Sequence, residues 1–219
     1  MNLLIDGLPE VVEVCGQEVR ISTSFRTGIL FEETIRDLTL TAPEKLQTAL
    51  ELYYPGVTFE GLDAVEEALD RLLWFYRCGE DPEKTTGSND EEQNEDAADD
   101  ELQFSYEHDA DYIYAAFLQA YGVDLAKDTL HWWQFRALFQ ALPEDTQFMK
   151  IIGYRVMKIP AKMSKEQKQY YQRMKRIYKL PEPEYKQQLE SDLSTLLMNG
   201  GNPSALLDGG RDQWHQTEL

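Results

Sequence analysis

Hydrophobic and polar positions alternate near the start of the chain. Residues 11–14 (VVEV) and 19–22 (VRIS) are short β-branched runs on either side of residues 15–18. Gly16 in that segment can adopt a positive φ without a steric penalty, which suits a tight turn. The pattern predicts a β-hairpin over residues 11–22, with a third short strand at residues 3–5.

From residue 24 the apolar positions recur at helical spacing, after Thr23 or Ser24 as a candidate N-cap. The residues at this spacing are Phe25, Ile29, Phe31, Ile35 and Leu38. A second helix is predicted to begin at Thr41, with Glu44 in the capping-box position, and to stop before Pro55 and Gly56. A third is predicted at 61–77. We expect it to bury Leu62, Val65, Leu69, Leu72, Leu73 and Phe75 or Tyr76.

Residues 80–101 break the pattern completely. This tract holds 11 acidic residues and one lysine, without an aromatic or large aliphatic residue. Such a segment cannot bury enough apolar surface to offset an ordering entropy of about 1–2 kcal/mol per residue. We therefore predict a disordered linker. A calcium-binding loop is disfavoured, because the tract lacks alternating ligands around a glycine with a closing glutamate.

Helical patterns resume after the tract, at about 108–121, 129–142, 144–157 and 164–180. Ser164 and Gln167 have the spacing of a capping box for the last of these. A final helix is predicted at 185–198, before Asn199-Gly200-Gly201. The predicted fold class is mainly α, with an N-terminal β-hairpin. The predicted domains are a hairpin-plus-helices domain (1–79), the acidic linker (80–101), a helical domain (102–200) and a flexible tail (201–219).

Charge is distributed unevenly along the 219 residues. The formal net charge is −19, and residues 1–100 carry 24 acidic and 7 basic residues. Residues 150–186 carry 11 basic and 3 acidic residues, so a basic segment follows a strongly acidic one. The overall charge should repel nucleic-acid phosphates and anionic membranes. We therefore expect neither nucleic acid nor a membrane as a partner.

The sequence contains no pattern typical of export. No apolar run approaches the roughly 18 to 20 residues that cross a bilayer, and the first residues lack a basic region followed by an apolar one. We expect the protein in the cytoplasm of the cell that makes it. Cys15 and Cys78 are then expected to stay reduced.

Candidate catalytic chemistry is sparse. His108 lies between Glu107 and Asp109, but these side chains diverge on a helix, and Asp109 and Asp111 suit a helix N-terminus by charge alone. His131 and His215 have no ligand-like neighbours, and no nucleophile or phosphate-binding motif occurs. We expect no enzymatic activity, no cofactor and no metal.

The aromatic residues after the tract are candidates for partner contact. Most recur at helical spacing and should form the core. Adjacent Trp132 and Trp133 cannot both point inward on one helix, so one of them should lie at a helix boundary or on a contact surface. Exposed large aromatics are typical interface anchors. The predicted partner-binding residues are Trp132, Trp133, Phe135, Tyr112, Tyr171 and Arg173.

The basic helix at 164–180 interleaves cations with tyrosines. Three interpretations stay open for it: a solvated helix face, a nucleic-acid contact, or a contact with an acidic protein surface. The last includes the first domain of another copy, so a homo-oligomer is among the expected partners.

Several motifs in combination resemble a known family. They are Phe104-x-Tyr106-x-x-Asp109, residues 113–117 (IYAAF) leading to 121–125 (YGVDL), residues 130–138 (LHWWQFRAL), and Leu142-Pro143 through 151–155 (IIGYR). With the preceding hairpin-plus-helix part and the tract, they resemble the "gene product fifteen" family of tailed phages and prophages of Gram-positive bacteria. The similarity spans about residues 1–180.

The resemblance implies a helical, non-catalytic morphogenesis protein of the tail module. Such proteins are encoded between the major tail protein and the tape-measure protein, where tail-assembly chaperones lie. The expected partners are then the tape-measure protein and the tail-tube protein, in the host bacterial cytoplasm. Two alternatives remain: a structural virion component such as a connector or tail subunit, and an acidic host-directed mimic of nucleic acid.

Overall fold

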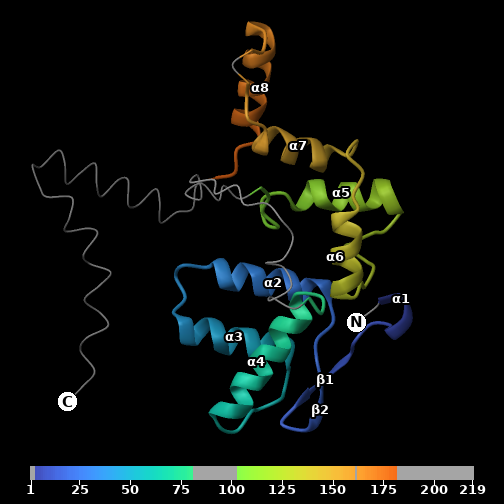
Figure 1. Ribbon diagram of the computed structural model, residues 1–219, viewed down its shortest axis with the longest axis vertical. Helices are drawn as coiled ribbons and strands as arrows, with labels where there is room; N and C mark the ends of the chain where they lie inside the picture. Colours follow the sequence, from blue (N-terminus) through green and yellow to red (C-terminus); the bar gives the residue numbers. More distant parts are fainter. Residues whose placement is uncertain (1–2, 81–102, 161, 182–219) are drawn as a thin grey trace, which may run out of the picture. The chain divides into compact units, whose positions relative to one another are not determined.

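The computed structural model describes residues 3–80, 103–160 and 162–181. Over these residues the chain forms eight helices and two strands, shown in Figure 1. The prediction of a mainly α-helical fold with a small N-terminal hairpin is confirmed.

The hairpin pairs β1 (Val11–Val14) with β2 (Gln17–Arg20) in antiparallel register, with Val12 opposite Val19. Its turn has only two residues, Cys15 and Gly16, with φ of 50° and 73°. Positive φ at both central positions is typical of the tight turns whose twist matches paired strands. The turn is therefore shorter than predicted, and the second strand begins two residues earlier.

The predicted strand at residues 3–5 is wrong. These residues form the short helix α1 (Leu3–Asp6), and Gly7 follows with a φ of 77°. A glycine in the left-handed region commonly ends a helix, so Gly7 was the local signal for this turn. Leu4 and Ile5 are exposed, and the sheet of the described residues consists of β1 and β2.

Three helices follow the hairpin: α2 (Phe25–Arg36), α3 (Ala42–Tyr53) and α4 (Leu62–Tyr76). Ser24 caps α2, and the backbone N–H of Thr41 donates to the Glu44 carboxylate at 2.8 Å, as the capping box predicts. Leu62 is 86% exposed, so its predicted burial is wrong; it is the first residue of α4 and precedes the buried face.

Helix α4 also holds the hairpin. The backbone N–H of Cys15 donates to Glu67 at 2.8 Å, and the Arg71 guanidinium donates to the carbonyl of Glu13 at 3.0 Å. Glu67 and Arg71 are one helical turn apart on α4 and therefore lie on the same face. The tip of the hairpin is thereby fixed to the helix.

The later helices all fall within their predicted ranges. They are α5 (Ala110–Tyr121), α6 (Trp132–Gln140), α7 (Gln147–Val156) and α8 (Lys165–Ile177). Ser164 caps α8, with Gln167 bonding back to it. Gly122 ends α5 with a φ of 68°.

One hydrophobic core joins the segments on both sides of residues 81–102. Helix α2 packs against both α3 and α6, and α7 packs against both α5 and α8. The described residues up to Lys179 accordingly form one compact unit. The predicted acidic linker beyond Glu80, the last predicted helix and the tail lie outside the described residues. Separate folding of the first and second parts stays a prediction.

Candidate partner-binding site

The first turn of α6 is fixed to the start of α2. An isolated β-bridge joins Ser24 and His131, and the backbone N–H of Trp132 donates to the carbonyl of Thr23 at 2.7 Å. His131 caps α6, because its Nδ1 accepts a bond from the backbone N–H of Trp133 at 3.1 Å. Its Nε2 therefore carries the proton and donates to the carbonyl of Pro9 at 2.9 Å.

Both indole groups of α6 bond to the end of α4. Trp132 Nε1 donates to the carbonyl of Tyr76 at 2.8 Å, and Trp133 Nε1 donates to that of Phe75 at 2.7 Å. The last carbonyls of a helix lack helical partners, and the Trp132 indole supplies one to Tyr76. The Phe75 carbonyl accepts both the Trp133 indole and the backbone N–H of Cys78, the latter at 3.0 Å. A Cβ at Gly28 would overlap the Trp132 ring, so this glycine makes room for it in α2.

The expectation that one of these tryptophans forms an exposed contact surface is wrong. Trp132 is 0% exposed and Trp133 is 4% exposed. The alternative, a helix boundary, is what the structure contains, because the two residues open α6 and the end of α4 covers them both. Phe135 is also fully buried and stacks on Phe25 and Phe117, with centroids 5.0 and 5.1 Å away. These three aromatics belong to the core.

The other three predicted partner-binding residues lie close to a tyrosine cluster of α7 and α8. Tyr112 of α5 packs edge-on against Tyr178, with centroids 6.4 Å apart. Tyr171 of α8 is half-buried beside Tyr154 of α7, and Arg173 is exposed on α8. The structure thus divides the predicted set into a buried group and a group at the surface.

Helix α8 packs against the chain through tyrosines. Tyr178 stacks on Tyr154 with an interplanar angle of 12°, and the hydroxyls of Tyr154 and Tyr170 are 3.2 Å apart. The latter hydrogen bond is the main cause of a raised pKa for Tyr154. No residue of α8 is buried, and Tyr170 and Ile177 are 49% and 53% exposed. Helix α8 therefore presents apolar surface that the described core does not cover.

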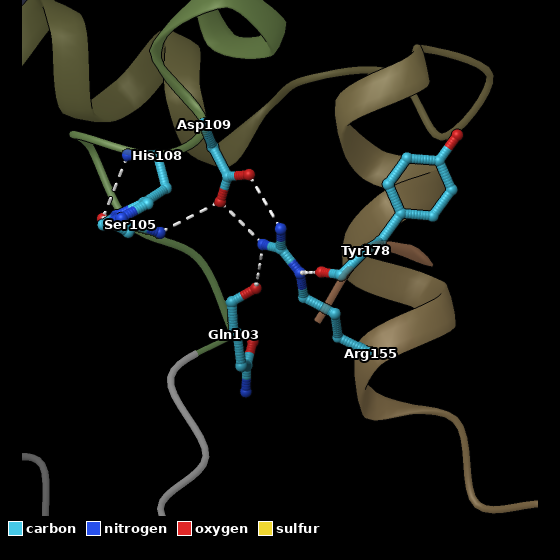
Figure 2. A network of polar contacts seen from close by, with 6 residues as sticks. All are labelled: Gln103, Ser105, His108, Asp109, Arg155 and Tyr178. Atoms are coloured by element: carbon cyan, nitrogen blue, oxygen red, sulfur yellow. Dashed lines mark hydrogen bonds and ion pairs between the residues drawn. The ribbon is translucent and has the colours of Figure 1, made fainter. Parts of the chain in front are cut away.

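A buried ion pair positions the end of α8, as Figure 2 shows. Arg155 of α7 binds Asp109 in a bidentate manner, at 2.6 Å to Oδ2 and 2.8 Å to Oδ1. The same guanidinium donates to the carbonyls of Tyr178 at 2.6 Å and Gln103 at 3.1 Å. One side chain therefore links the approach to α5, the start of α5 and the end of α8.

Sequence reasoning missed this ion pair. Asp109 was predicted only as an acidic residue near a helix N-terminus; it is the N-cap residue, but its carboxylate accepts bonds from Ser105 and Arg155. The only signal was that Asp109 and Arg155 both belong to the quoted family motifs. They are 46 residues apart, and spacing alone does not reveal that contact.

Cys15, Cys78 and His108 are the residues that the sequence offered for nucleophilic or metal chemistry. Burial raises the pKa of the Cys78 thiol to about 11, and the pKa of Cys15 is raised as well, which disfavours a thiolate in both. His108 bonds to Ser105 and lies 3.8 Å from Glu107. The described residues contain no cluster of three or more potential metal ligands. No helix among them is long and apolar enough to cross a membrane.

A known protein family matches most of the chain. The family model described as bacteriophage Gp15 protein matches residues 4–180, which is most of the chain. The chain therefore belongs to the bacteriophage Gp15 protein family. Neither a curated protein nor a solved structure matches it.

Proposed function

We propose that this phage protein is a tail-morphogenesis factor, specifically a tail-assembly chaperone that binds the tape-measure protein in the host cytoplasm without catalytic turnover. Membership of the bacteriophage Gp15 family supports a structural or morphogenetic role. The tail-tube protein is a second expected partner, because tube subunits replace the chaperone during assembly.

The observation that carries the proposal is the surface of α8. A chaperone for a long helical chain needs a partly apolar contact on a highly charged, soluble protein. Helix α8 leaves Tyr170 and Ile177 exposed with Arg173 between them, on a chain of net charge −19. Tyrosine and arginine are enriched among the residues that contribute most to binding energy at protein interfaces.

Co-expression with the tape-measure protein of the same phage or prophage tests the proposal. The wild-type chain should retain the tape-measure protein in the soluble fraction and co-purify with it. Tyr170→Ser/Ile177→Ser should reduce the retained amount by about tenfold or more, which corresponds to about 1.4 kcal/mol. Leu118→Ser, at a residue of α5 that is 46% exposed, is the matched control and should have no effect.

Two results would contradict the proposal. The first is a wild-type chain that neither binds nor solubilises the tape-measure protein. The second is a stoichiometric amount of the chain in purified virions, measured by mass spectrometry, because this would support a connector or tail subunit instead.

A further inference from the structure

The exposed stripe of α8 lies among basic residues. Residues 162–181 carry seven basic residues and one acidic residue. Arg173 and Arg176 are exposed, and neither forms an ion pair with another described residue. Tyr170, Arg173 and Ile177 are spaced by three and four residues, which places them along one face. The stripe therefore combines two exposed apolar side chains with the charge of Arg173, and Arg176 follows on the same helix.

The start of α4 has the opposite chemistry. Leu62 is 86% exposed, and Val57 just before the helix is 42% exposed. Glu66 and Asp70 follow Leu62 at intervals of four residues, so all three lie along one face of α4. Both carboxylates are exposed, and neither forms an ion pair within the described part of the chain.

We propose that α8 of one copy docks on the Leu62–Glu66–Asp70 face of α4 of a second copy. The two stripes match in length, because the seven steps from Tyr170 to Ile177 and the eight steps from Leu62 to Asp70 each span about 10–12 Å of helix. They also match in chemistry. Each surface has exposed apolar side chains beside charged ones, and the charges are basic on α8 and acidic on α4. A second copy is the occupant, because each chain leaves both surfaces exposed.

This self-association uses the surface of α8 that the proposed function assigns to the tape-measure protein, so the two contacts would compete. Its test needs only the purified chain, so it can fail or succeed whether or not the tape-measure protein binds. Two chains of net charge −19 repel each other, but at about 0.15 M salt this repulsion is screened beyond about 8 Å. The opposite charges at the contact are closer than that and still attract. The ion pairs between the two copies would lie at the surface, where each contributes little to stability. The association should therefore be weak and concentration-dependent.

Charge reversal and mixing test the pairing directly. Sedimentation velocity of the purified full chain at about 0.15 M salt should show a mass that rises with concentration. Arg173→Glu/Arg176→Glu on α8, or Glu66→Lys/Asp70→Lys on α4, should each weaken association at least about tenfold. An equal mixture of these two variants should associate again, because reversed α8 then meets reversed α4, and native α8 meets native α4.

The matched controls are Arg20→Glu/Lys150→Glu and Glu18→Lys/Glu144→Lys, which change the same charges at exposed positions elsewhere. They should associate like the wild type. Leu62→Ser removes an apolar contact at a residue that the core does not use, so it should weaken association without a change in melting temperature.

The proposal is overturned by a chain that is monomeric at every concentration, or by a mixture that fails to associate. Weakening by the α8 reversal alone would also overturn it, since another acidic segment, such as residues 81–102, would then be the occupant. Equal weakening by the controls would show that only total charge matters.

Discussion

At the scale of single residues, Tyr53 and Tyr54 are neighbours with different hydrogen bonding. They are 0% and 1% exposed. The Tyr54 hydroxyl donates to the carbonyl of Ala68 at 2.8 Å, whereas the buried Tyr53 hydroxyl has no partner among the described residues. Burial raises the pKa of both hydroxyls, so neither is a candidate base.

This difference predicts opposite outcomes for the same substitution. Tyr53→Phe should leave the free energy of unfolding unchanged or raise it by up to about 1 kcal/mol, because it removes a buried unsatisfied group. Tyr54→Phe should lower it by about 0.5–1.5 kcal/mol, because it removes a hydrogen bond. Urea denaturation of both variants measures the difference, and an equal loss in the two would show that the Tyr53 hydroxyl has a partner.

His131 predicts a pH dependence. Burial lowers its pKa below 6.5, although Pro9 and Glu10 act in the opposite direction. The unfolded chain therefore binds a proton at a higher pH than the folded chain, so this histidine's contribution to stability is complete above pH 6.5 and is lost as the pH falls through the folded pKa. His131→Asn retains a capping oxygen and should be less sensitive between pH 7.5 and 5.5 in urea denaturation. Equal slopes for variant and wild type would contradict this role.

At the scale of elements, the sequence predicts contacts between residues that are close along the chain and misses contacts between residues that are far apart. The capping boxes at Thr41 and Ser164 were predicted correctly, because all their groups lie within three residues. The burial of both Trp132 and Trp133 was not predicted, because it depends on carbonyls of α4 that are 56 and 58 residues away. Three of the candidate residues (Trp132, Trp133 and Phe135) therefore lie in the core and three (Tyr112, Tyr171 and Arg173) lie on α5 and α8 outside it. Partner binding by the latter three stays a prediction.

The Arg155 network predicts how α5, α7 and α8 depend on one another. Asp109→Asn should destabilise the protein by about 3–5 kcal/mol, because it leaves the Arg155 charge buried without its counter-ion. Replacing both residues, as Asp109→Leu/Arg155→Met, should cost less than the single change, because neither charge then remains buried. Thermal unfolding followed by circular dichroism measures both. A double variant that is less stable than Asp109→Asn would show that the bonds of Arg155 to Gln103 and Tyr178 matter more than the ion pair.

At the scale of the whole molecule, the two sides of residues 81–102 share one core. The Phe25 backbone N–H donates to the Leu130 carbonyl at 3.0 Å, and Trp132 stacks on Tyr76 with centroids 5.3 Å apart. The expected division at residues 80–101 came from composition alone. Composition describes which segments cannot build a core, but it does not show whether their neighbours build one core or two.

The shared core predicts the behaviour of a cut chain. A protease site inserted within residues 81–102 and cleaved in the folded protein should yield two fragments that co-elute in size-exclusion chromatography. They should separate only in denaturant, because separation would expose Trp132, Trp133 and Phe75 to water. Fragments that separate in buffer and remain helical would instead support two independently folded domains.

The bonds between the α6 indoles and the end of α4 also set an order of events during synthesis. Trp132 is added to the chain 56 residues after Tyr76, which takes roughly 3–11 s at about 5–20 residues per second. During that interval the hairpin and the first long helices have been made, but the side chain that fills the space over Gly28 does not yet exist. A ribosome stalled between these points would carry a first half whose inner apolar face is still open to water and to other chains.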